Sequence, residues 1–391
     1  MNWNEKTAAN VKAIKPSGIR KFFDIAAQVK GVLSLSIGEP DFAAPDKVLD
    51  AMKASLDAKE TSYTGNSGMM ELREAISQHF EKRYGVHYDP KDEILVTVGV
   101  SEGLAMALLA ITEPGDEVII PDPAYVAYPA SVELAGGTPV FVPTYPEHDF
   151  KLTVEALEKV ITPKTKAIVI GYPNNPTGTV MSAEELMPIA KFAEEHDLIV
   201  LSDEIYCELM YGDAKFTSFA KLPGMRERTV IFNGFSKAYA MTGMRLGYVC
   251  APREGLAPIL KLHQYAIMCA NTTAQVGGIT ALKECDDDVE AMRQEYDRRR
   301  KVIYKGLCDM GLPVFEPKGA FYIFPDIRCT GMTSAEFCEK LVQEEKVAVV
   351  PGTAFGAQGE GFVRISYAAS MDTIQEALKR MARFVEKYRS C

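Results

Sequence analysis

Short apolar runs alternate with amphipathic stretches along the middle of the chain, between Glu93 and Ala251. The amphipathic stretches have helical periodicity, and one of them, Ser182–His196, begins with a Ser-x-x-Glu capping signal. Runs that are apolar at consecutive positions indicate strands buried on both faces, and their alternation with helices predicts a mostly parallel sheet. The seven predicted strands are Ile94–Val98, Val118–Ile120, Val140–Val142, Ala167–Ile170, Ile199–Leu201, Val230–Phe232 and Leu246–Cys250.

The pattern changes after Cys250, where helical segments dominate up to Met310. The elements predicted beyond this point are strands at Ala320–Phe324, Val347–Val350 and Phe362–Ser366, a helix near Ser334–Glu345 and a terminal helix. We therefore predict an α/β fold with a large unit at 45–280. A smaller α+β unit is expected from the N-terminal arm, 1–44, together with 281–391. The two units should enclose a cleft, and ligands of such sheets bind beyond the carboxyl ends of the strands.

Composition narrows the class of protein further. The chain has 391 residues, 47% of them hydrophobic and 25% charged, with a net charge of -10. An acidic surface repels nucleic acid and anionic membranes, so neither is expected as a partner. The longest apolar run, Leu104–Ile111, is far shorter than the roughly 18 residues of a membrane span, and Met1–Ile14 does not resemble a signal peptide. Eight cysteines without a CxxC pair indicate a reducing, cytoplasmic location, and the five histidines lack metal-ligand spacing, so no metal is predicted.

The first candidate site is Gly99-Val100-Ser101-Glu102-Gly103, between a predicted strand and a helix. It matches the Gly-x-Ser-x-Gly nucleophile elbow of α/β-hydrolases, but a hydrolase also needs a histidine base. Of the three histidines that follow, His196 and His263 lie in helical patterns, which leaves His148. The same turn could bind phosphate through free amides at a helix N-terminus, or it could be an ordinary turn.

Three further clusters follow predicted strands. The first, Tyr172–Gly178, is a rigid Pro-Asn-Asn-Pro-Thr-Gly loop. The second contains Asp203, a carboxylate at the end of a buried strand, which needs a cationic partner unless it caps a helix. The third contains Lys237, followed by Arg245. A shielded lysine loses part of its preference for the charged form and can form a Schiff base, whereas a lone lysine is usually a solvated surface group.

Together and in this order, the four clusters resemble the class I/II aminotransferases of the fold-type I pyridoxal-phosphate family. The motifs are Asn-Asn-Pro-Thr-Gly, Asp-Glu-Ile-Tyr and Ser-Lys…Arg-x-Gly-Tyr, and the likeness runs from Ser17–Arg20 and Ile37–Phe42 to Val363–Tyr367. Within the family, the chain is most similar to the bacterial aminotransferase A group, which includes N-acetyl-diaminopimelate aminotransferases. The resemblance implies an enzyme that uses pyridoxal 5'-phosphate to move an amino group from an amino acid to a 2-oxo acid by a ping-pong mechanism.

The resemblance also implies a role for individual residues. Lys237 would hold the cofactor as a Schiff base and then carry the proton, and Asp203 would pair with the pyridine nitrogen. Tyr206 and Asn175 would bond the phenolic oxygen of the ring, and Tyr125 would stack on its face.

The phosphate and the substrate would be held by other groups. The backbone of Ser101 and Glu102 would bind the phosphate together with Arg245. Arg364 would clamp the substrate carboxylate, with Gly38 and Asn175 close by. Tyr63 would reach the phosphate from a neighbouring subunit, which implies a homodimer with shared active sites.

Two positions depart from the common pattern of the family. Gly234 stands where many relatives have serine, so Ser236 is expected to supply the missing hydroxyl. Met244 stands where many have tryptophan, a change that should affect packing alone.

Two other functions remain compatible with these residues. A carbon–sulfur β-lyase on the same fold would use the same lysine and aspartate, but it would release pyruvate and ammonia without an amino acceptor. A non-catalytic effector-binding domain of a transcription regulator would normally carry a helix-turn-helix unit. We do not expect one, because the chain begins at once with the enzyme arm.

For the substrate side chain we predict that Arg20 or Lys21, a basic pair in the N-terminal arm, favours dicarboxylic or acylated substrates. Replacing Arg20 by alanine should lower kcat/KM for 2-oxoglutarate, because the distal carboxylate would lose its cation. An unchanged value would exclude this role.

Overall fold

The computed structural model describes residues 1–14, 18 and 29–389. Its central layer is a seven-stranded sheet of order β2-β8-β7-β6-β5-β3-β4, in which β8 runs antiparallel to both neighbours and the other pairs are parallel. The strands are β2 (Ile94–Thr97), β3 (Glu117–Asp122), β4 (Thr138–Pro143), β5 (Thr165–Ile170), β6 (Ile199–Asp203), β7 (Thr229–Gly234) and β8 (Gly247–Cys250). All seven predicted strands and the mostly parallel α/β sheet are thus confirmed.

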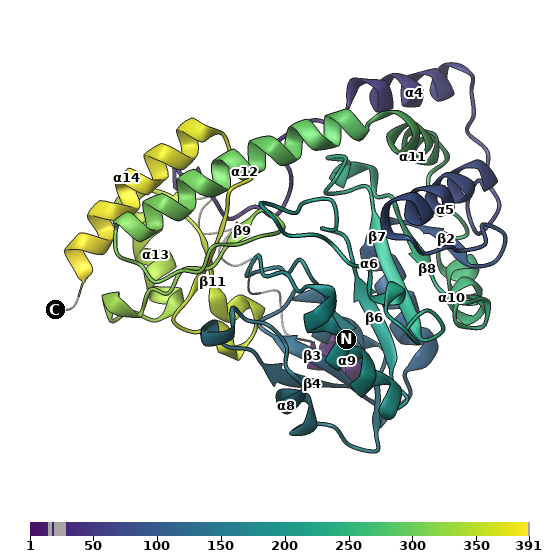
Figure 1. Cartoon of the computed structure of the whole chain (residues 1–391), viewed down its shortest axis with the longest axis horizontal. Coiled ribbons are helices and arrows are strands. Elements are labelled where there is room, and N and C mark those ends of the chain that lie inside the picture. The colour runs from purple at the N-terminus through teal and green to yellow at the C-terminus, as the bar shows by residue number, and fades with distance from the viewer. Residues whose placement is uncertain (15–17, 19–28, 390–391) are drawn as a thin grey trace.

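Helices cover both faces of this sheet (Figure 1). The side chains of β3 alternate between two cores: Val118 and Ile120 join the cluster of α6, α7 and α10, whereas Ile119 joins that of α8 and α9. A third cluster packs α4, α5 and α11 against β2 and β8. The helices are α4 (Asp46–Asp57), α5 (Met70–Tyr84), α6 (Gly99–Ile111), α7 (Ala127–Leu134), α8 (Val154–Glu158), α9 (Ala183–Glu195), α10 (Arg253–Ala266) and α11 (Thr272–Glu284).

A smaller α+β unit lies beside the main sheet, as predicted. Its antiparallel sheet has the order β11-β12-β9, and a separate pair joins β1 to β10 in parallel. Its strands are β1 (Leu33–Ser34), β9 (Tyr322–Ile323), β10 (Val347–Ala348), β11 (Val350–Pro351) and β12 (Val363–Ser366), and its helices are α12 (Asp286–Asp309), α13 (Ser334–Glu345) and α14 (Met371–Tyr388). The long helix α12 runs from the end of α11 across the molecule to α14 (Figure 1). The two short N-terminal helices are α1 (Trp3–Lys6) and α2 (Ala9–Ala13).

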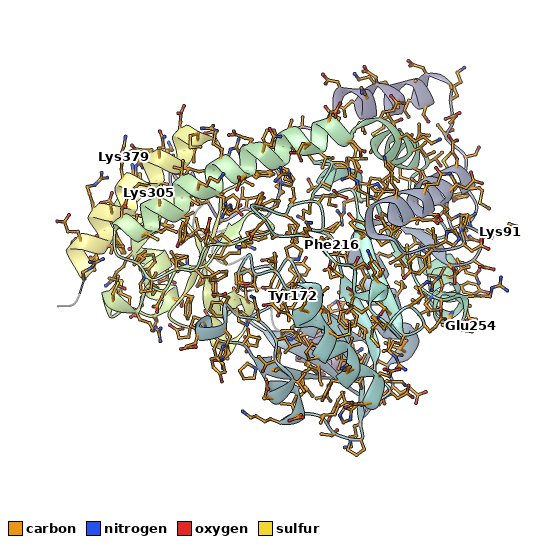
Figure 2. The ribbon with its side chains drawn as sticks, in the orientation of Figure 1. Lys91, Tyr172, Phe216, Glu254, Lys305 and Lys379 are labelled. Carbon is orange, nitrogen blue, oxygen red and sulfur yellow. The ribbon has the colours of Figure 1, made fainter. Side chains whose placement is uncertain are left out.

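The carboxyl ends of the parallel strands face the smaller unit. Tyr172, which follows β5 closely, lies near the middle of the molecule, while Lys379 and Lys91 lie toward its two outer ends (Figure 2). The segment after β1 also reaches this region, because the backbone N–H of Ser366 in β12 donates to the carbonyl of Leu35 at 2.8 Å. Within the described part of the chain, no helix combines the length and apolar character needed to cross a membrane.

Candidate active site

A cavity of about 510 Å³ lies where the carboxyl ends of the strands meet the smaller unit. Chain segments far apart in the sequence contribute its walls, which explains why the candidate residues are scattered along the chain. Ten of the residues singled out from the sequence line this cavity: Gly38, Ser101, Tyr125, Asn175, Asp203, Tyr206, Ser236, Lys237, Arg245 and Arg364.

Lys237 projects its amine into this cavity from the segment after β7. Its Nζ donates a hydrogen bond to the carbonyl of Gly38 at 2.7 Å. Withdrawal from water and, to a smaller extent, the positive charge of Arg364 lower the pKa of the Lys237 amine to about 8. About a tenth of the amine is therefore uncharged at pH 7, far more than for an ordinary lysine, and this fraction can act as a nucleophile.

Asp203 is the last residue of β6, and its side chain is buried. Its Oδ2 accepts a hydrogen bond from the Tyr128 hydroxyl at 2.8 Å, and its Oδ1 accepts from the backbone N–H of Ile205 at 3.2 Å. Burial raises the pKa of Asp203, and these two donors and the charge of Lys237 oppose the rise. The carboxylate is thus oriented toward a cavity in which a cationic ring nitrogen would stabilise its charge.

Arg364, on β12, contributes a buried guanidinium to the cavity wall. Its Nη1 donates to Oδ1 of Asn175 at 3.0 Å, and its Nη2 donates to the carbonyl of Ser36 at 2.6 Å. Burial lowers the pKa of Arg364, and its Nε has no partner among the described residues. A planar cation held by neutral acceptors retains its full charge for a carboxylate ligand.

The N-terminus of α6 forms a third wall. No side chain caps this helix, since its N-cap residue is Val98. Gly99 has φ +75°, and a Cβ there would lie 2.5 Å from Nη2 of Arg245. Glycine at this position therefore lets the guanidinium approach the turn closely. Uncapped amides beside an arginine suit a phosphate dianion.

Three predicted site residues lie elsewhere. Glu102 does not line the cavity, because its side chain contacts His263 and the Val98 amide, so the phosphate role of its backbone stays a prediction. Tyr63 is 80% exposed in the single chain and is not part of the wall formed by described residues. Arg20 and the adjacent Lys21 fall outside the described residues.

Sequence reasoning did not single out several residues of the wall. Tyr128 holds Asp203, and the Tyr322 hydroxyl lies 2.8 Å from that of Tyr206. Glu39 also lines the cavity, and its Oε2 accepts from the Thr242 hydroxyl at 3.2 Å. Tyr322 belongs to a strand that was predicted only for its apolar pattern, so nothing marked its hydroxyl as part of the site.

The two departures from the family pattern have structural explanations. A Cβ at Gly234 would lie 2.8 Å from the Cα of Gly247, so no serine could fit here without a shift of the backbone. Ser236 does line the cavity, which keeps it available as the alternative hydroxyl. Met244 packs against the core cluster of α4, α5 and α11.

Comparison with known proteins agrees with this geometry. The model of the family "Aminotransferase class I and II" matches residues 30–381. The chain belongs to this family. It is therefore a pyridoxal-phosphate-dependent aminotransferase. Its family, together with a cavity that no histidine among the described residues lines, excludes the serine hydrolase alternative.

Individual relatives carry different substrate names. The chain is 50% identical to an aspartate aminotransferase of Pyrococcus abyssi, over 96% of this chain and 97% of the relative. It is 44% identical to the probable N-acetyl-LL-diaminopimelate aminotransferase of Bacillus subtilis, over 97% of this chain and 95% of the relative. A crystal structure of the aromatic aminotransferase of Pyrococcus horikoshii superposes with a TM-score of 0.90 at 49% identity, covering 94% of this chain and 99% of that one.

The lowered pKa of Lys237 gives a direct test of the cavity's electrostatics. We expect ¹³C-methylated Lys237 of the cofactor-free protein to titrate with a midpoint near 8 in NMR spectra. An Arg364→Met variant should raise that midpoint toward the ordinary 10.5, because a neighbouring positive charge is removed. A Lys237→Arg variant assigns the resonance, and an unperturbed midpoint in the wild-type protein would contradict this description.

Proposed function

We propose that this cavity binds pyridoxal phosphate and moves the amino group of an L-amino acid to a 2-oxo acid such as 2-oxoglutarate by a ping-pong mechanism. The observation that carries the proposal is the convergence of Lys237, Asp203 and Arg364 on one cavity from three separate segments. Lys237 would supply an amine for the cofactor's carbonyl, Asp203 a counter-charge for a ring nitrogen, and Arg364 a cation for a substrate carboxylate.

The residues present fit the cofactor. Asp203 would keep a proton on the pyridine nitrogen, because its buried carboxylate gains a counter-ion in that state. The uncapped first turn of α6 and Arg245 would hold the phosphate, with Ser236 nearby, and Tyr125 would stack on the ring. Tyr206 and Asn175 would donate to the phenolic oxygen. When bound, pyridoxal phosphate supplies a carbonyl that captures amino groups and a ring that accepts electrons.

Lys237 would move the proton of the reaction. Its amine lies 2.7 Å from the Gly38 carbonyl, at the side of the cavity where the arm meets the smaller unit. Because the pKa of this amine is lowered to about 8, it would take the proton from the substrate Cα near neutral pH and deliver it to the cofactor carbon that bears the transferred nitrogen.

Arg364 would orient the substrate through its α-carboxylate. The guanidinium is fixed by Asn175 and by the carbonyl of Ser36, so little side-chain freedom is lost when a carboxylate binds. Relatives named as aspartate, aromatic and N-acetyl-LL-diaminopimelate aminotransferases are 44 to 50% identical to this chain. The role of Arg20 or Lys21 in choosing among such substrates stays a prediction.

Two further assignments belong to this proposal. We propose the division into a large unit at 45–280 and a small unit of 1–44 and 281–391, supported by the main sheet lying within 94–250 and the small sheets outside it. The proposed border at 281 crosses the last turn of α11. A cytoplasmic location is supported by free, buried thiols at Cys207, Cys250 and Cys338.

The single-turnover half-reaction tests the proposal. Adding one amino acid without an acceptor should convert the visible absorption band of the holoenzyme to a near-ultraviolet band, and 2-oxoglutarate should restore it. Lys237→Ala should slow this exchange by about 10²–10⁴-fold, because the proton carrier is lost. Lys305→Ala, on the outer face of α12, is the matched control and should behave as wild type. Steady release of pyruvate and ammonia without an acceptor would instead favour the lyase.

We also propose a homodimer in which Tyr63 of one subunit reaches the phosphate of the other. Hydrogen bonds hold the segment 62–66 against 268–275: Asn66 donates to the Met268 carbonyl, and Thr272 donates to the Ser62 carbonyl, both at 2.8 Å. Exposed apolar side chains lie on these two segments and just before the second. Tyr63, Tyr265 and Met268 are 80%, 86% and 44% exposed. Such a patch on a single chain is typical of a buried subunit interface.

Sedimentation velocity should give twice the 43.0 kDa of one chain. Tyr265→Glu should shift the protein toward the monomer and weaken cofactor binding, because a charge enters an apolar interface and the partner's tyrosine is withdrawn. Phe141→Glu, an exposed position on β4 outside this patch, is the control and should stay dimeric. A fully active wild-type monomer would overturn the shared site.

A further inference from the structure

A buried pair joins the phosphate-binding turn to a distant helix. His263 of α10 is fully buried, and its Nδ1 lies 2.7 Å from Oε1 of Glu102, whose side chain is 7% exposed. Neither group contacts the cavity through its side chain, so the proposed mechanism leaves this pair without a role.

Glu102 has a second contact that spans the turn itself. Its Oε2 accepts a hydrogen bond from the backbone N–H of Val98 at 2.6 Å. Val98 is the N-cap of α6, and Glu102 lies in the first turn. The arrangement resembles a capping box, in which an acidic side chain early in the helix satisfies the N-cap amide. One carboxylate therefore fixes both ends of the turn whose residues Val100 and Ser101 line the cavity.

Close contacts with the surrounding backbone leave this turn little room to move. Gly99 adopts φ +75°, and a Cβ at Gly247 would lie 2.7 Å from the Val100 nitrogen. A Cβ at Gly103 would lie 2.6 Å from Cγ2 of Val249. The turn is pressed against β8, so a small displacement of its amides changes their distance from a bound phosphate.

The bonding pattern favours one tautomer of His263. Its Nε2 is buried and has no partner among the described residues. A proton on Nε2 would therefore be an unsatisfied buried donor, whereas a proton on Nδ1 is donated to the Glu102 carboxylate. In the neutral Nδ1–H form, His263 supplies a partner to Oε1, which would otherwise be a buried charged oxygen without a donor.

We propose that His263 is a positioning residue for the cofactor phosphate, acting through Glu102 on the amides of the α6 turn. The proposal rests on the proposed function, since it takes the phosphate to bind at this turn. His263 touches neither substrate nor cofactor, and its contribution is to keep the carboxylate in the orientation that holds the Val98 amide.

Measuring the affinity for the cofactor distinguishes this positioning role from a role in stabilising the fold alone. His263→Leu should raise the dissociation constant of pyridoxal phosphate about tenfold, because a buried charged acceptor loses its donor and the turn shifts. The ³¹P chemical shift of the bound phosphate should move in the same variant. His263→Asn, whose side-chain amide can replace the Nδ1–H donor, should recover most of the affinity.

A second histidine–glutamate pair, which is half-buried, supplies the matched control. His79 Nε2 lies 3.3 Å from Oε1 of Glu208, with side chains 9% and 12% exposed, away from the turn. His79→Leu should lower the Tm of the cofactor-free protein and leave the dissociation constant unchanged. If His263→Leu behaves in the same way, lowering Tm without changing affinity, the positioning role is overturned.

Two further variants keep the test decisive. If His263→Leu does not fold, Glu102→Gln is measured in its place. A raised dissociation constant for pyridoxal phosphate supports the positioning role, and a wild-type value overturns it. Arg245→Met tests the phosphate site itself. A rise in the dissociation constant for Arg245→Met with no change for His263→Leu would reject the positioning role alone, whereas no change in either would reject the phosphate site as well.

Discussion

Removal of charged groups from water at one edge of the main sheet is the constraint on which this structure depends. Asp203 and Arg364 are buried, and the amine of Lys237 is drawn inside the cavity. A buried charge costs several kcal/mol unless hydrogen bonds or counter-ions compensate for the lost solvent. The fold supplies those partners from elsewhere in the chain: Tyr128 to Asp203, the Gly38 carbonyl to Lys237, and Asn175 to Arg364.

The same constraint explains why the smaller unit is attached where it is. Arg364 belongs to β12, and the Gly38 carbonyl lies in the segment after β1, so two of the cavity's key groups come from outside the main sheet. The hydrogen bond from Ser366 to Leu35 and the pairing of β1 with β10 hold these segments together. A ligand that spans Lys237 and Arg364 therefore contacts both units and would stabilise their mutual arrangement.

Much of the fold follows from the pattern of apolar residues. The inner strands of the main sheet contain short apolar runs such as Ile168–Ile170, and burial on both faces makes such runs recognisable without tertiary information. The reversed direction of β8 was not predictable in this way, since Leu246–Cys250 has the same apolar character as its parallel neighbours. Direction depends on the connections, and periodicity does not encode them.

The residues of the site also fall into those that the sequence predicts and those that only the structure shows. Residues within specific motifs, such as Asp203 and Lys237, were predicted together with the cavity that they line. Tyr128, Tyr322 and His263 were not predicted, because each acts through a contact with a residue at least 75 positions away. The structure shows such contacts directly, while a single sequence gives only the identities of the partners. Glu102 illustrates the difference, since its backbone was predicted for phosphate and its side chain proved to hold the turn.

The charges of the cavity limit how its substrates can be recognised. Among the described residues that line it, the cations are Lys237, Arg245 and Arg364, and the anions are Glu39 and Asp203. If Arg245 binds the phosphate and Arg364 the α-carboxylate, no described cation of the wall remains for a second carboxylate. An aromatic side chain needs none, and Tyr125 and Tyr322 offer it ring surfaces. Recognition of an acidic side chain would then require a cation from the N-terminal arm or from a second subunit. Discrimination between acidic and aromatic substrates therefore depends on these outer segments, while the sheet edge supplies the chemistry common to both.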